Sequence, residues 1–128
     1  MEGNILDTVV ETAVIKEALA ITTTSPANGA TGVAVDSNIV LEFNEAITRG
    51  SNPFINIYKT SSDEHVEGIY IGSEMVSGNQ ITINRSTSAL LCPNTSYYII
   101  IMPGAIKDMA GNDYEGINDK TTWSFTTN

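Results

Sequence analysis

Apolar and polar residues alternate along most of the chain from Thr22 onward, with the two-residue period of a half-buried β-strand. Turn-forming clusters rich in Gly, Asn and Ser separate the alternating segments. Strands are predicted over residues 38–43, 54–59, 65–71, 80–84, 97–102 and 121–127, after an irregular first strand at 23–33 that Pro26 and an Asn28-Gly29 turn interrupt. The pattern predicts one all-β domain over residues 22–128, an antiparallel sandwich of about seven strands.

A tyrosine at the start of a late strand gives this prediction more detail. Residues 91–97 read Leu-Cys-Pro-Asn-Thr-Ser-Tyr and lead directly into an apolar strand. In immunoglobulin-like and fibronectin-III-like sandwiches, such a tyrosine turns its ring into the core and its hydroxyl back to the upstream backbone. We therefore expect a tyrosine corner at Tyr97, and a small buried side chain at Cys92. The expected core determinants are Tyr97, Trp123, Phe125, Phe43 and Leu41.

Residues 1–21 follow a different pattern. Apolar residues recur there at close to helical spacing, and acidic residues interrupt them. Without a basic n-region the segment is a poor signal peptide, and its charges argue against a membrane span. It is interpreted as a leader, a linker or a short amphipathic helix that docks on the sandwich or pairs with another copy. Any export signal is expected to lie outside this chain.

The charge balance excludes several classes of partner. Six Lys and Arg residues stand against fifteen Asp and Glu residues, for a net charge of -9. A protein so acidic repels phosphate backbones and anionic lipid, so we expect no nucleic-acid binding and no insertion into a membrane. The single Cys92 cannot form an internal disulfide.

Four blocks of sequence carry a family resemblance. They are residues 25–33, 40–47, 104–112 and 123–127, and together they resemble the bacterial Ig-like domains of S-layer, adhesin and other large cell-surface proteins. The resemblance covers residues 22–128. It implies an extracellular or cell-surface spacer or adhesion unit that occurs in tandem or beside a catalytic module, with the neighbouring domains of a larger polypeptide as its partners.

Catalysis has no positive sign in the sequence. The only histidine, His65, falls in a predicted exposed hairpin beside Asp63 and Glu64. No phosphate-binding loop, zinc-ligand spacing or nucleophile elbow is present in the sequence. We expect a protein that is not an enzyme and requires no cofactor.

Calcium is the one metal that the sequence suggests. Asp108, Asn112 and Asp113 surround Gly111 in an acidic loop, and hard cations prefer such oxygen ligands. The spacing is not that of an EF-hand. The alternative is that Asp108 and Asn112 cap a helical turn over residues 105–109 while Gly111 takes a positive φ, with no ion.

Carbohydrate binding is the remaining hypothesis. Phe54, Tyr58 and Tyr70 fall on the strand faces opposite the buried isoleucines, where they would form an outer aromatic patch for a glycan or a cell-surface protein. Aromatic residues on an exposed sheet face also stabilise it by cross-strand pairing, which needs no ligand.

Overall fold

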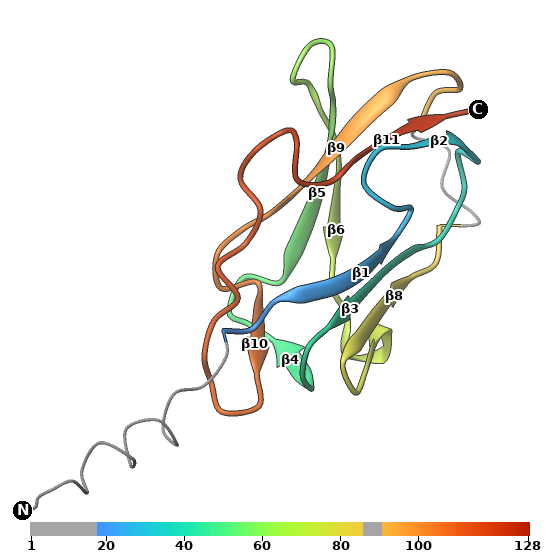
Figure 1. Ribbon diagram of the computed structural model, residues 1–128. Helices are drawn as coiled ribbons and strands as arrows, with labels where there is room; N and C mark the ends of the chain where they lie inside the picture. Colours follow the sequence, from blue (N-terminus) through green and yellow to red (C-terminus); the bar gives the residue numbers. More distant parts are fainter. Residues whose placement is uncertain (1–17, 86–90) are drawn as a thin grey trace, which may run out of the picture.

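The computed structural model describes residues 18–85 and 91–128, and these form an all-β sandwich (Figure 1). A 3-10 turn, η1 (Ser73–Met75), is the one helical element of the described residues. The strands are β1 (Ile21–Ser25), β2 (Ala30–Val33), β3 (Ile39–Phe43), β4 (Ile47–Arg49), β5 (Phe54–Lys59), β6 (His65–Tyr70), β7 (Val76–Ser77), β8 (Gln80–Ile83), β9 (Ser96–Ile101), β10 (Ile106–Asp108) and β11 (Ser124–Thr127).

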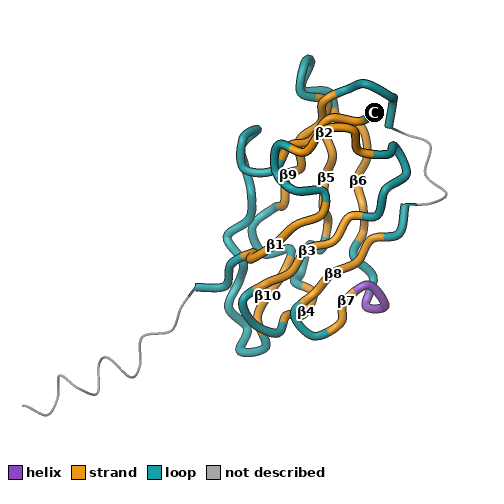
Figure 2. Tube along the Cα trace, turned by 45° about the vertical axis from the view of Figure 1, so that its right-hand side comes forward, coloured by secondary structure: helices purple, strands orange, loops and turns teal. Residues whose placement is uncertain are grey.

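Two main sheets form the layers of the sandwich. One has the strand order β1-β3-β8-β7, and the other has the order β2-β11-β9-β5-β6. Figures 1 and 2 show β1, β3 and β8 side by side in one layer, with β9, β5 and β6 in the other. A small sheet of β4 and β10 completes the lower end. Pairing is antiparallel except between β2 and β11, which run parallel.

The predicted fold class is confirmed, and three local predictions need correction. The irregular first strand is two strands, because the chain crosses at Pro26 from the sheet of β1 to the sheet of β2. Residues 106–108, for which a helical turn was one alternative, form strand β10 because they pair with β4. Cys92 is exposed, because it lies in the turn before β9 rather than inside the corner.

The core lies between the two sheets and is built by alternation. Along β3, Ile39, Leu41 and Phe43 are buried, and along β5 the buried residues are Ile55 and Ile57. Strand β9 adds further buried residues. Phe125 on β11 and Trp123, the residue before β11, fill the rest of the core. Removal of this apolar surface from water is the main favourable term for folding.

Two aromatic residues of the core also make hydrogen bonds with the backbone. The backbone N–H of Cys92 donates to the Tyr97 hydroxyl at 2.7 Å, and the Tyr97 ring is 1% exposed. The Trp123 indole Nε1–H donates to the Pro26 carbonyl at 2.7 Å, which connects the last strand to the crossing between β1 and β2. Both bonds give a buried polar atom its partner.

We expect Tyr97→Phe to lower the free energy of unfolding by about 1 kcal/mol, because the Cys92 N–H loses its acceptor while the buried ring stays. Urea denaturation measures the change. An unchanged midpoint would show that the corner hydrogen bond does not stabilise the fold.

A buried ion pair joins the two sheets between β6 and the chain just after β8. Arg85 follows β8 and is 3% exposed, and its Nη2 lies 2.7 Å from Glu67 Oε1 on β6. Its Nη1 donates to the Val35 carbonyl at 2.9 Å. Neither sequence pattern nor spacing indicated this pair.

The packed domain includes residues that sequence analysis placed with the leader. Leu19 is buried in the core, and Asn44 accepts a hydrogen bond from the Ala20 N–H and donates one to the Ala18 carbonyl. The predicted leader or amphipathic helix otherwise falls on residues 1–17, outside the described part. No helix among the described residues is long and apolar enough to cross a membrane.

Candidate functional site

The acidic loop after β10 is organised by the Asp108 side chain. Asp108 is 1% exposed, and its Oδ1 accepts hydrogen bonds from the N–H groups of Ala110 and Asn112 at 3.0 and 2.8 Å. Its Oδ2 accepts a third bond from Asn112 Nδ2 at 3.0 Å. Gly111 takes the positive φ of 92° that this turn requires. Both carboxylate oxygens are therefore engaged in turn formation.

The other acids of the region point to separate partners. Asp113 Oδ1 lies 3.2 Å from Lys107 Nζ. Hydrogen bonds hold the pKa of Asp119 below its usual value. The largest contribution comes from the backbone N–H of Thr121, and the side chain and backbone N–H of Thr122 add to it. Within residues 18–85 and 91–128, no three His, Cys, Asp or Glu side chains lie close enough to hold a metal ion. This geometry favours turn chemistry for Asp108, Asn112 and Asp113.

Thermal melts of the chain in EDTA and in millimolar calcium are therefore expected to superimpose. An ion bound only by the folded state would raise the melting temperature by mass action. A clearly higher melting temperature in the presence of calcium would mean that these oxygens exchange their present hydrogen-bond donors for the ion. In that case Asp108→Asn should abolish the rise.

The aromatic residues of the outer sheet face form two clusters. Phe54 on β5 and Tyr70 on β6 are cross-strand partners, with ring centroids 5.4 Å apart and exposed fractions of 37% and 52%. Arg49 Nη1 donates to the Tyr70 hydroxyl at 2.8 Å. Tyr58 lies four residues further along β5, about 13 Å away at the usual rise of a strand. The three predicted residues thus share a face but not a single patch.

Sequence analysis missed the neighbours that extend each cluster. Met102 is 43% exposed and follows Ile101, whose partner on β5 is Ile55, so Met102 comes next to Phe54 in the ladder. At the other cluster, Tyr58 stacks on Tyr98 at 5.3 Å and meets the His65 ring edge-on at 5.1 Å. The alternation of β9 was the available signal, since residues 98, 100 and 102 all fall on the outer face.

The loops beside Tyr98 close this second cluster. The Tyr98 hydroxyl donates to Asp63 Oδ1 at 2.8 Å, and Lys120 Nζ lies 2.9 Å from the same oxygen. The Lys120 ammonium also stands 5.5 Å from the centroid of the Tyr98 ring. The hydrogen bonds from Lys120 and then Tyr98 lower the pKa of Asp63. Asp63 is thus a structural link between the β5–β6 turn and the loop before β11.

The histidine contacts neutral groups. His65 is exposed at the start of β6, and its Nε2 lies 3.0 Å from Asn56 Oδ1. A nucleophile–base pair needs a Ser or Cys within hydrogen-bonding reach of the imidazole. The contacts of His65 are with Asn56 and Tyr58, which supply no such nucleophile.

The chain is similar in fold to a solved structure. The crystal structure of CopC from Methylosinus trichosporium OB3b superimposes with a TM-score of 0.58 over 86% of this chain and 93% of that chain. The two sequences are 14% identical, so the likeness concerns the fold alone. A search of curated proteins finds no match.

The sequence also matches a family, over residues 15–127, whose description is bacterial Ig-like domain. Domains of this family are generally noncatalytic and are often extracellular. The match includes residues 18–21, which the structure packs against the core. Because it covers most of the chain and agrees with the sandwich described above, this chain belongs to the bacterial Ig-like domain family.

Proposed function

We propose that this chain is a noncatalytic module of a secreted or cell-surface bacterial protein, of the S-layer or adhesin kind, which spaces or holds neighbouring domains. The observation that carries the proposal is the position of the two ends of the described domain. Strand β1 begins toward the lower end of the sandwich, and the C-terminus lies toward the upper end (Figure 1). A domain crossed from one end to the other suits a serial arrangement in a longer polypeptide.

The strand pairing at the two ends supports the same proposal. Tension applied at residues 18 and 128 pulls β2 toward its start and β11 toward its end, and these two strands are parallel. Such a pull loads their hydrogen bonds in shear, so that several must break together. The C-terminus is further fastened because Asn128 N–H donates to the Val33 carbonyl at 2.9 Å and the Asn94 N–H donates to the Asn128 carbonyl at 2.8 Å.

A second candidate is carbohydrate binding at the outer sheet face. It is favoured by the exposed row of Tyr70 on β6, Phe54 on β5 and Met102 just after β9. Apolar and aromatic faces of this kind can stack on sugar rings, and Arg49 and Asn56 lie close enough in the sheet to supply polar contacts. An accessory role beside a secreted enzyme would use the same face.

Retention of the chain on a glycan array and on purified bacterial cell walls separates the two candidates. A spacer is expected to show no retention on either. If the chain is retained and Tyr70→Ala abolishes the retention, carbohydrate binding rather than spacing is the function. The matched control is Met109→Ala, which truncates a side chain that is 70% exposed on a different loop.

A further inference from the structure

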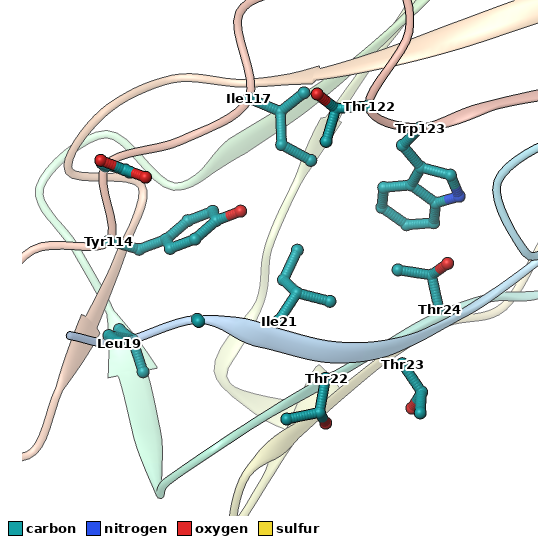
Figure 3. Close-up of a pocket in the computed structure, with 11 residues that line it drawn as sticks. Leu19, Ile21, Thr22, Thr23, Thr24, Tyr114, Ile117, Thr122 and Trp123 are labelled. Atoms are coloured by element: carbon teal, nitrogen blue, oxygen red, sulfur yellow. The ribbon is translucent and has the colours of Figure 1, made fainter. Parts of the chain in front are cut away.

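A groove opens between β1 and the segment 114–123 on one side of the sandwich (Figure 3). It has a volume of about 360 Å³. Its floor is apolar and consists of Leu19, Ile21, Tyr114, Ile117 and Trp123. Small apolar clefts of this size, with a few polar groups at defined positions, are typical binding sites.

A glycine sets the wall of the groove opposite β1. Gly116 has a φ of 92°, and a Cβ there would collide with the Ile101 carbonyl oxygen. This close approach lets Ile117 form a bridge with Ile101 at the end of β9. The bridge holds Tyr114 and Ile117 at the groove.

The Tyr114 side chain supplies the polar group. It is 7% exposed, and Figure 3 shows its hydroxyl directed into the groove toward Ile21 and Ile117. No residue in the described part of the chain makes a hydrogen bond with that hydroxyl. Burial raises the pKa of Tyr114 to about 12, so the group keeps its proton at neutral pH. The hydroxyl opens onto the groove, so an acceptor bound there would replace water as its hydrogen-bond partner.

The free edge of β1 borders the same groove. Ile21 and Thr24 point toward Trp123, whereas Thr22 and Thr23 point away, yet all four residues line the groove. The backbone of β1 must therefore face it. Among the described strands only β3 pairs with β1, and β1 carries no charged residue. Edge strands usually carry charges or prolines that prevent further pairing, and this one has neither.

We propose that residues 8–15 of a second copy of this chain bind along β1 and fill the groove. Six of these eight residues, Thr-Val-Val-Glu-Thr-Ala-Val-Ile, are β-branched, which suits an added strand. Their carbonyl groups provide an acceptor for the Tyr114 hydroxyl, and an alternate side chain fills the space between Ile21 and Trp123. Main-chain bonds at an open edge combined with a side-chain pocket are the usual form of strand addition.

The position of this segment favours a second copy over the segment's own domain. Residues 18–20 separate residues 1–17 from β1, and they are held in place because Leu19 is buried and Asn44 bonds to Ala18 and Ala20. Return into the same groove would require a reversal next to these fixed residues. A two-fold axis near the start of β1 avoids that reversal, because it sets each segment antiparallel to the partner's β1 and makes the interface isologous.

The net charge of -9 gives the association a characteristic salt dependence. Two copies repel each other at low ionic strength, and the interface adds to this repulsion because Glu115 lines the groove and Glu11 lies within residues 8–15. Added salt screens this repulsion. The dimer should therefore tighten as the salt concentration rises.

Sedimentation equilibrium of residues 1–128 tests the proposal, in a Cys92→Ser background that prevents disulfide-linked dimers. The expected result is a two-chain mass that falls to one chain on dilution, with slower amide exchange at Thr22 to Thr24 in the dimer. Val10→Asp with Val14→Asp should give one chain. Ser61→Asp with Ser62→Asp adds the same charge at an exposed turn and should leave the dimer intact. Tyr114→Phe removes one hydrogen bond from each of the two equivalent halves of the interface and should weaken association roughly thirtyfold.

Three results would overturn the proposal. One is a single-chain mass at every concentration and salt. Another is a two-chain mass that survives the valine substitutions, which would place the dimer contact on another face. The third is a single-chain species whose β1 amides are protected until those valines are replaced, which would show that the segment binds its own domain.

Discussion

Replacing Trp123 with alanine is expected to lower the free energy of unfolding by about 4 kcal/mol, within the range for large-to-small changes in a packed core. The side chain is 1% exposed, and its indole N–H holds the Pro26 carbonyl at the crossing from β1 to β2. The substitution therefore opens a cavity and leaves a carbonyl without its donor. Since small domains are stable by only about 5–15 kcal/mol, the effect is a large part of the total.

Urea denaturation followed by far-UV circular dichroism measures this change, because the variant has no tryptophan to report fluorescence. Met109→Ala is the matched control, since Met109 is 70% exposed and should change the midpoint little. The midpoint of Trp123→Phe should lie between those of Trp123→Ala and Met109→Ala, because phenylalanine keeps part of the apolar contact but loses the hydrogen bond. Equal midpoints for Trp123→Ala and Met109→Ala would mean that Trp123 does not hold the two sheets together.

The second large effect is expected at the ion pair between the sheets. Arg85→Met should lower the free energy of unfolding by about 3 kcal/mol, because it leaves the Glu67 carboxylate, itself only 19% exposed, without its cation. The Val35 carbonyl also loses its donor. The value lies at the lower end of the range for buried pairs, since Glu67 retains some access to water.

A double-mutant cycle separates the cost of the orphaned charge from the loss of packing. Arg85→Met combined with Glu67→Met should recover most of the stability, since an apolar pair of similar size replaces a buried ion pair without penalty in other proteins. Additive losses in the double variant would show that the two side chains act independently, and that the salt bridge does not join β6 to the chain after β8.

The features that the sequence predicts are those that local patterns encode. Alternation along residues 38–43 and 54–59 predicts which isoleucines are buried, because a side chain's face depends on its own strand alone. Tyr97 is similar, since its hydroxyl partner Cys92 is five residues away. Gly111 takes the positive φ expected beside Asp108, whereas the helical turn considered for residues 105–109 is replaced by pairing of β10 with β4.

Features that depend on distant parts of the chain were not predictable from one sequence. Arg85 meets Glu67 across the sandwich, and β10 meets β4 from nearly sixty residues away. The groove is another case, because β1 and Tyr114 become neighbours only when both sheets have formed. For the aromatic face, alternation placed Phe54 and Tyr70 on the correct side, but the separation of Tyr58 from them depends on which residues of β6 and β9 lie opposite.

The proposed spacer function depends most on the way in which β2 and β11 carry tension. The direct measurement is the unfolding force of single molecules in a Cys92→Ser background, pulled in two directions. Handles at residues 18 and 128 load the parallel pair in shear. Handles at Asp36→Cys and residue 128 instead start from neighbouring strand ends, where the Asn128 N–H meets the Val33 carbonyl, and separate the pair one bond at a time. We predict a clearly higher unfolding force for handles at residues 18 and 128 than for handles at residues 36 and 128. Equal forces would contradict the claim that the β2–β11 pair resists tension.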